Sequence, residues 1–321
     1  MVINRVHRIF RPWLCITILC LLTSACSTTF FYRHLDWLLI RFVEGYVELN
    51  TTQKQHIRSD LAQINATLEQ SVLPDLQALL ERLARDNEQG RMGDNLEQYM
   101  LQFETLFKRT AKLAEPGIVV LALSLDNEQK NQFFDELERR NEKFQRKYIA
   151  KGEAHARNEH LRELRKNTKK WLGKIGAEQN LALQVYDANY RANEQGWLES
   201  RQRWQAELKR VLNMGNVDAK SARLSKLLLQ PQDYWTSAYK SVADDNRAVS
   251  IALTQQLAAH MDAGQRSKFA RQLTKNQKKV ANFAQAIATT KPQEIAGQQS
   301  SPSVATATLQ PVGLPRTAYS H

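Results

Sequence analysis

Cysteine is scarce in this chain of 321 residues, which has only Cys15, Cys20 and Cys26. The first two lie in an apolar stretch near the N-terminus that is typical of a cleaved signal, so only Cys26 would remain after export. A chain with one cysteine can form neither an internal disulfide nor a metal site built from several cysteines. The sequence therefore gives the exported part no redox role and no cysteine-based metal site.

Proline is also rare: between residues 35 and 288 it occurs only at Pro74, Pro116 and Pro231. No stretch alternates apolar and polar residues over the length that a strand ladder needs. Apolar residues instead recur at spacings of three and four, which places them on one face of a helix. The sequence predicts an all-α fold, an elongated bundle of many helices.

The strongest internal boundary is Pro116-Gly117. If the bundle has two lobes, this boundary separates residues 35–116 from residues 117–288. From residue 289 four prolines stand among Ser, Thr, Ala and Gln, without Phe or Trp. That composition predicts a disordered tail over residues 289–321.

Catalytic and cofactor motifs are missing. The sequence contains no His-Glu-x-x-His or Glu-x-x-His motif, no Gly-rich phosphate loop and no Gly-x-Ser-x-Gly elbow. His155 and His160 lie near acidic residues, but a spacing of five puts them about 140° apart around a helix. We expect no enzyme activity, no cofactor and no metal; a hydrolase built from distant residues is the least favoured interpretation.

The N-terminus has the layout of a secretory signal. A basic segment, residues 1–11, precedes an apolar run, residues 12–22, and Thr23-Ser24-Ala25 stand directly before Cys26. The apolar run is much shorter than the roughly 20 residues that span a bilayer. Small residues followed by cysteine resemble the lipobox of bacterial lipoproteins, although Thr23 stands where leucine is usual.

The lipobox resemblance implies an address. Residues 1–25 would be a signal peptide, Cys26 would carry the lipid, and residues 26–34 would be a short tether. Several acyl chains on one cysteine hold a protein stably on a membrane. Ser27 replaces the aspartate that retains lipoproteins in the inner membrane, so the resemblance implies the outer membrane, facing the periplasm.

Aromatic residues follow the predicted anchor: Phe30, Phe31, Tyr32 and Trp37. Because they are so close to Cys26 in the chain, we expect them near the bilayer surface, where aromatic side chains are favoured. One interpretation places this segment in the interface as an amphipathic helix. The other docks it on the body as the first core helix, since such periodicity is typical of core faces.

The same segment carries a family resemblance. Tyr32-Arg33-His34-Leu35-Asp36-Trp37-Leu38-Leu39 resembles a Tyr-x-x-Leu-Asp-Trp-Leu-Leu segment of an uncharacterised family of proteobacterial lipoproteins. Trp171-Leu172-Gly173, ahead of Gln179, is similar to a second pattern of that family. The resemblance implies a location and a helical fold, over residues 26–288, and no activity.

Four predicted helix starts share one pattern, a cap-type residue three places before a glutamine. They are Asn50 with Gln53, Asp126 with Gln129, Gly176 with Gln179, and Asp262 with Gln265. The pattern predicts a capping box, in which the glutamine reaches back to the N–H of the cap residue. It also faintly resembles the Leu-Thr-x-x-Gln motif of Spy-type periplasmic chaperones, which are much shorter.

Positive charge is concentrated in one segment. The formal net charge is +12, of which residues 1–25 contribute three, and residues 139–174 hold thirteen Lys and Arg against four Glu, a net of +9. We expect a long basic helix that Gly152 could bend. Its candidate residues for binding an anionic partner are Arg139, Arg140, Lys143, Lys147, Arg162, Arg165, Lys166, Lys169, Lys170 and Lys174.

Such a run is either a solvated face or a binding surface, because crowded like charges favour an anionic counterpart. Anionic lipid, lipopolysaccharide, peptidoglycan or an acidic protein would fit, whereas an exported protein rarely meets nucleic acid. The first functional hypothesis is therefore a membrane-anchored binding protein for an anionic envelope component. The alternative is a chaperone-like holdase with an exposed apolar face.

Overall fold

The computed structural model describes residues 34–297, and none of these residues forms a strand. The all-α prediction is confirmed. The elements are α3 (Leu35–Glu44), α4 (Thr51–Thr67), η2 (Leu68–Val72), α5 (Leu73–Glu88), α6 (Leu96–Leu123), α7 (Asn127–Phe144), η3 (Gln145–Ile149), α8 (Glu153–Leu172), α9 (Ala177–Asn189), α10 (Glu194–Leu212), α11 (Val217–Leu229), η4 (Pro231–Tyr234), α12 (Ser237–Ala259) and α13 (Ala263–Gly297). The predicted signal peptide and Cys26 lie outside the described residues, as do Phe30, Phe31 and Tyr32.

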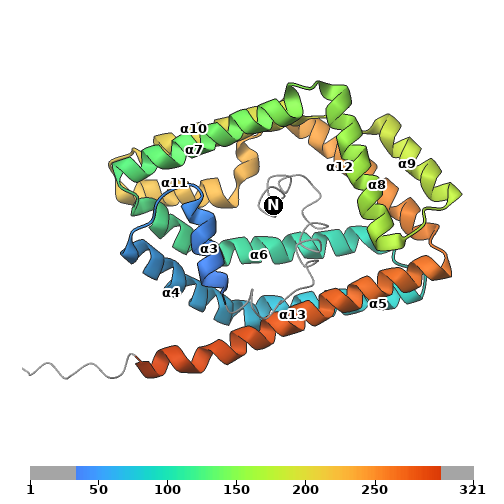
Figure 1. Ribbon diagram of the computed structural model, residues 1–321, viewed down its shortest axis with the longest axis horizontal. Coiled ribbons are helices and arrows are strands. Elements are labelled where there is room, and N and C mark those ends of the chain that lie inside the picture. Colours follow the sequence, from blue (N-terminus) through green and yellow to red (C-terminus); the bar gives the residue numbers. More distant parts are fainter. Residues whose placement is uncertain (1–33, 298–321) are drawn as a thin grey trace, which may run out of the picture.

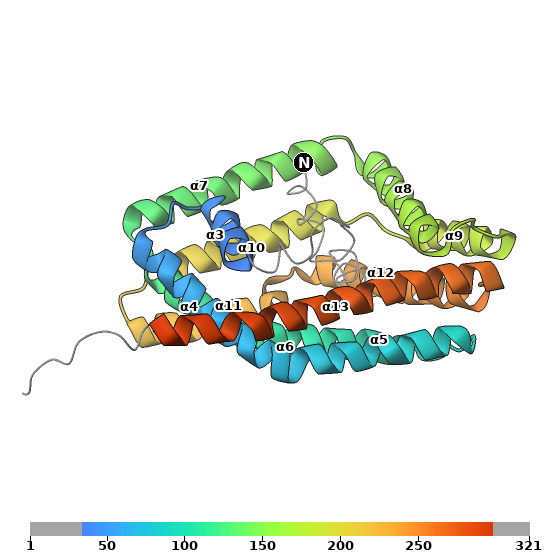
Figure 2. The same cartoon turned by 60° about the horizontal axis from the view of Figure 1, so that its bottom comes forward.

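The helices are arranged around an elongated ring (Figure 1). α7 and α10 run along one long side, and α13 runs along the other beside α5. α3 and α4 lie at one end, and α8, α9 and α12 lie at the other. Turning the ring brings its lower edge forward and shows α13 lying along α5 (Figure 2).

The largest apolar core forms where the last helix packs against an early one. Leu80 of α5 and Leu273 of α13 are both fully buried in one cluster, which also takes in Phe103 of α6 and Trp171 of α8. Burying apolar side chains of this size stabilises a fold by about 1.5–3 kcal/mol each. α13, the last described helix, is thus part of the main core through residues such as Leu273 and Ile287.

Two boundaries differ from the sequence predictions. Pro116 and Gly117 lie inside α6, so the chain does not break where a lobe boundary was predicted. The helix continues because apolar side chains on both sides of Pro116 pack into cores, among them Phe103 and Val119. α13 continues past residue 289 to Gly297, and the rest of the predicted tail, residues 298–321, lies outside the described residues.

The four predicted glutamine starts are confirmed. In each of them the glutamine Oε1 accepts a hydrogen bond from the N–H of its own cap residue. The N–O distances are 3.0 Å at Asn50, 3.1 Å at Asp126, 3.0 Å at Gly176 and 3.1 Å at Asp262. All four glutamines are buried, so these polar groups serve the interior of the fold as well as the helix ends.

The four glutamines also pair with each other across the fold. Gln53 and Gln129 exchange two side-chain hydrogen bonds, and Gln179 and Gln265 do the same. Within each pair, every amide also donates to the carbonyl two residues before its partner's cap residue. These carbonyls belong to Ser124, Glu48, His260 and Lys174. The chain therefore contains the same two-helix junction twice.

Candidate functional site

The basic segment is not one long helix, which corrects the sequence prediction. α7 passes into the π-helical turn η3 and stops, and α8 begins after Gly152, whose φ is +82°. A left-handed φ at this position is available to glycine at little cost and ends the helix. The basic residues are therefore divided between two helices that run along different sides of the ring (Figure 1).

The arginines of α7 are engaged within the fold. Glu136 accepts hydrogen bonds of 2.5 Å from both Arg139 and Arg140, and Arg139 first and then Arg140 hold the pKa of the Glu136 carboxyl below its usual range. Arg140 also donates to the Tyr46 hydroxyl and to the Gly45 carbonyl. Arg140 therefore ties α7 to the loop after α3, whereas Arg139 is held by Glu136 on its own helix.

Two lysines continue the α7 half of the segment. Lys143 and Lys147 are exposed, and the Lys147 ammonium lies 5.0 Å from the centre of the Tyr148 ring. No ion pair holds either lysine within the described residues. They present positive charge to solvent, although α8 carries more of it.

α8 keeps part of its charge in local pairs. Arg162 pairs with Glu159 at 2.5 Å, Lys166 lies 3.8 Å from Glu163, and Arg165 donates to Asn180 of α9. Pairs of this kind at spacings of three on an exposed helix contribute little. The arrangement leaves the end of α8 with the least neutralised charge.

Lys169, Lys170 and Lys174 lie at that end, and all three are exposed. α13 brings more lysines to the same place: the Lys268 ammonium donates to the Lys169 carbonyl at 3.1 Å. The pKa of Lys279 is lowered by burial and then by the charges of Lys170 and Lys275. We call these residues the lysine surface: Lys166, Lys169, Lys170, Lys174, Lys268, Lys275 and Lys279.

Packing below the lysine surface holds its two helices together. Trp171 of α8 is buried, and its ring lies 5.4 Å from the ring of Phe269 on α13. Since a buried tryptophan fixes both partners, lysines about a hundred residues apart in sequence are kept on one surface. The α8 lysines are among the candidate residues chosen from the sequence, whereas those of α13 are not.

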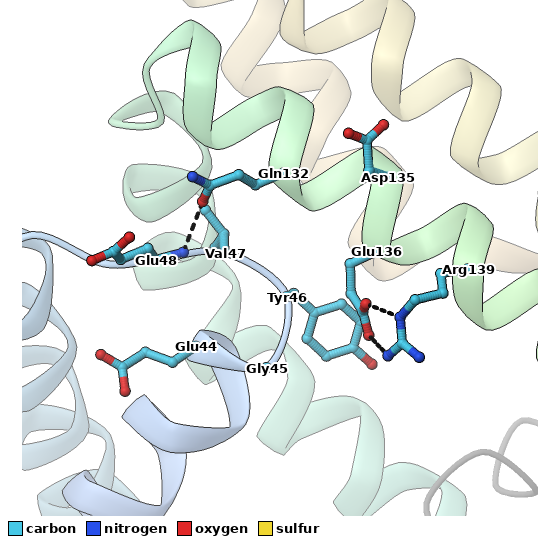
Figure 3. A pocket seen from close by; sticks show the side chains of 9 residues that line it. All are labelled: Glu44, Gly45, Tyr46, Val47, Glu48, Gln132, Asp135, Glu136 and Arg139. Atoms are coloured by element: carbon cyan, nitrogen blue, oxygen red, sulfur yellow. Dashed lines mark hydrogen bonds and ion pairs between the residues drawn. The ribbon is translucent and has the colours of Figure 1, made fainter.

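A shallow pocket between α7 and the loop after α3 has the opposite charge (Figure 3). Its carboxylates come from Glu44, Glu48, Asp135 and Glu136, with Arg139 as its basic residue. Glu44 pairs with Lys54 at 2.7 Å, which, by hydrogen bonding, lowers the pKa of that carboxyl. Within residues 34–297, no group of three or more metal-binding side chains could hold an ion.

The histidines of the basic segment serve packing. The His160 ring stacks on Tyr190 with a centroid distance of 4.0 Å, and its Nε2 lies 2.8 Å from the Tyr186 hydroxyl. His155 is partly exposed on the same helix. The contacts of the His160 ring are therefore with two tyrosines, and no metal-binding group among residues 34–297 includes either histidine.

α3 has one docked face and one open face. Ile40 is buried in a cluster with Val47 and Ile57, whereas Trp37 is 54% exposed and Phe42 is 46% exposed. The helix is thus part of the body, as one of the two interpretations required. Its other face leaves these two aromatic side chains exposed, and their location at the membrane surface stays a prediction.

Comparison with known proteins identifies the family. A family of unknown function, DUF6279, matches residues 45–240. The chain belongs to this family. No curated protein and no solved structure matches the chain.

The DUF6279 match covers α7 and α8 with the basic segment, as well as Gln53, Gln129 and Gln179. It ends at residue 240, before α13 and the lysines that α13 contributes. The expectation of an uncharacterised family is thereby confirmed over this range, while the segment Tyr32 to Leu39 lies before it. Across the described helices, none combines the length and apolarity that crossing a membrane requires.

Proposed function

We propose that this protein is a lipoprotein of the bacterial outer membrane, held by Cys26 on the periplasmic side, that binds an anionic component of the envelope. The observation that carries the proposal is the lysine surface, where exposed lysines of α8 and the exposed Lys275 of α13 gather beside the half-buried Lys268 and Lys279. Crowded ammonium groups repel each other, and an anionic partner relieves that repulsion. Phosphate groups of lipid headgroups or of lipopolysaccharide have the matching chemistry.

Family membership adds no activity, so the positive charge is the feature that supports a binding role. An anionic membrane surface attracts basic residues by about 1 kcal/mol for each lysine near it. Such attraction is screened within about 8 Å at physiological ionic strength, so it should be strongly salt-dependent. The proposal therefore predicts tight binding at low salt and weak binding at high salt.

The test uses the full exported chain with Cys26→Ser, so that a lipid on the protein cannot hold it on vesicles. Its binding to vesicles rich in phosphatidylglycerol, to neutral phosphatidylcholine vesicles and to lipopolysaccharide is measured by co-sedimentation. Reversing Lys166, Lys169 and Lys170 to Glu should weaken binding to the anionic material by a hundredfold or more, given about 1 kcal/mol for each charge.

A matched variant separates the surface from the overall charge. Lys112, Arg223 and Lys240 are exposed on other helices, and reversing them changes the net charge by the same amount. This control should bind almost as well as the parent. If both variants bind the anionic material equally weakly, or if neither binds it more weakly than the parent, the lysine surface is not the binding site.

The anchor has its own test. Mass spectrometry of the protein purified from membranes should find residues 1–25 removed and Cys26 carrying acyl chains, and sucrose-gradient fractionation should place it with the outer membrane. Cys26→Ser should release it into the soluble fraction. An unmodified Cys26 with the leader still attached would overturn the anchor and leave the charge argument intact.

A chaperone-like holdase is the second candidate. Leu181 and Val185 lie one turn apart on α9 and are 55% and 56% exposed, which gives the ring an apolar strip. A holdase should slow the aggregation of an unfolding client at stoichiometric amounts, and Leu181→Ser with Val185→Ser should abolish that effect. If neither protein slows aggregation, this second function is excluded.

A further inference from the structure

Arg201 of α10 is a partly buried arginine whose charge is not neutralised by any side chain of residues 34–297. Its guanidinium lies over the ring of Trp197, with 5.2 Å between the guanidinium carbon and the ring centre. Across the described residues, no carboxylate pairs with it and no carbonyl accepts from it. All five of its N–H donors are thus left for solvent or a ligand.

The neighbourhood makes this charge more costly. Burial lowers the pKa of Arg201; Tyr46 opposes this shift, and the positive charge of Arg140 on α7, a smaller effect, adds to it. Arg140 has its own partners, because Glu136, Tyr46 and Gly45 all accept from it. The nearby carboxylate of Glu136 is therefore already paired with Arg140, and Arg201 has no carboxylate partner among the described residues.

Aromatic rings hold the position of Arg201. The Trp197 ring lies 4.4 Å from the ring of Phe144, which lies 4.9 Å from that of Tyr148. The guanidinium of Arg140 lies 3.9 Å above the centre of Tyr46. Two guanidinium groups are therefore fixed over aromatic faces where α7, α10 and the loop after α3 meet, so an incoming anion would find donors already oriented.

From this arrangement we propose that Arg201 is the primary contact of a binding site for an oxyanion, a carboxylate or phosphate group carried by a ligand. A guanidinium matches either group with two parallel hydrogen bonds. Arg140 adds favourable charge without releasing its own partners, and the aromatic rings shield the contact from water. The site is separate from the lysine surface, since Figure 1 places α10 and α13 on opposite sides of the ring.

The experiment measures the thermal unfolding midpoint of the Cys26→Ser chain at fixed ionic strength in chloride, phosphate or acetate. A ligand that binds only the folded state raises the midpoint. We expect a rise of about 2 °C or more at saturation with the preferred anion. A rise with phosphate alone assigns the site to phosphate, and a rise with acetate alone assigns it to a carboxylate.

Three variants show where the anion binds. Arg201→Gln should lose the rise, whereas Arg203→Gln, exposed on the same helix, should keep it. The variant with Lys166, Lys169 and Lys170 reversed to Glu should also keep it, which separates this site from the lysine surface. A rise that persists in Arg201→Gln, or no rise with either anion, overturns the proposal.

A second measurement does not depend on stability. The Nε–Hε signal of Arg201, assigned by its absence in Arg201→Lys, should shift on titration with the anion that raises the midpoint. Arg201→Lys keeps the charge and loses the two-pronged donor geometry, so it should bind that anion at least tenfold more weakly. Equal affinity in Arg201→Lys would also refute a guanidinium site.

Discussion

Gln53 and Gln129 form two reciprocal hydrogen bonds between their side-chain amides. The Gln53 Nε2 donates to the Gln129 Oε1 at 2.9 Å, and the Gln129 Nε2 donates to the Gln53 Oε1 at 2.8 Å. The residues are 76 positions apart, and they are 2% and 7% exposed. A buried amide without such a partner would destabilise the folded protein, so the contribution of each glutamine depends on the other.

This dependence predicts non-additive mutations. Gln53→Leu and Gln129→Leu should each lower the free energy of unfolding by about 1–3 kcal/mol, because each leaves an amide unpaired. The double variant should cost less than the sum of the two by about 1 kcal/mol or more. Urea unfolding of all four proteins measures the coupling, with the exposed Gln55→Leu as control. Additive losses would contradict the amide pair.

Tyr99 and Asp86 predict a pH dependence. The Tyr99 hydroxyl donates to Asp86, which also accepts from Asn95. Burial first and the hydrogen bond second raise the pKa of Tyr99 to about 12, above the usual 10.0. The unfolded phenol ionises first, so the stability that Tyr99 contributes is complete below pH 10 and is lost as pH rises towards 12.

The contact between Tyr99 and Asp86 also predicts a change in stability at low pH. The hydrogen bond from Tyr99, followed by that from Asn95, lowers the pKa of Asp86 below 3.8, so this stabilisation is lost as pH falls below about 4. Tyr99→Phe should therefore be less stable than the parent at neutral pH and approach it at both extremes. Unfolding of both proteins from pH 3 to pH 12 shows the difference. A constant difference would refute the linkage.

Gly152 predicts a backbone effect. Its φ of +82° disfavours a side chain, while a Cβ there would meet nothing within 4 Å. With ψ at 161°, this conformation is essentially restricted to glycine, so Gly152→Ala should cost about 1–3 kcal/mol through the backbone alone. Gly215 has equally open space and no left-handed φ, so Gly215→Ala is the matched control and should cost little. Equal losses in urea unfolding would mean that α7 and α8 are not separated by a left-handed turn.

The two-helix origin of the lysine surface predicts a role for α13. Lys268→Glu with Lys275→Glu should weaken binding to phosphatidylglycerol vesicles by about thirtyfold, at about 1 kcal/mol for each charge. The salt dependence of the remaining binding should also become shallower. Lys112→Glu with Lys240→Glu provides the same change in net charge elsewhere. Unaltered binding in the α13 variant would confine the surface to α8.

Local signals in the sequence predicted much of the fold. The all-α class follows from the apolar spacing, and the four glutamine starts follow from cap residues three places earlier, since both depend on neighbours within one helix. The pairing of Gln53 with Gln129 could not follow, because a capping pattern does not name its tertiary partner. The helix break predicted at Pro116-Gly117 is absent from α6, because packing on both sides of Pro116 outweighs its local tendency to end a helix.

The candidate sites divide in the same way. The basic segment was visible from composition, and the use of Arg139 and Arg162 in local pairs could have been read from Glu136 and Glu159 three residues before them. Lys275 joins the lysine surface only through the packing of α13 on α8. Arg201 carries no sequence signal, because a single arginine in a polar helix is ordinary until its surroundings are known.

The packing of α13 along α5 has a consequence for the life of the chain. Leu80 of α5 is buried against α13, which begins at Ala263. A polypeptide that stops before this helix therefore leaves the apolar face of α5 exposed to water. Such a fragment cannot finish folding, however well its first helices form. Premature termination or C-terminal clipping should therefore yield products that proteases clear, and intact molecules alone should accumulate.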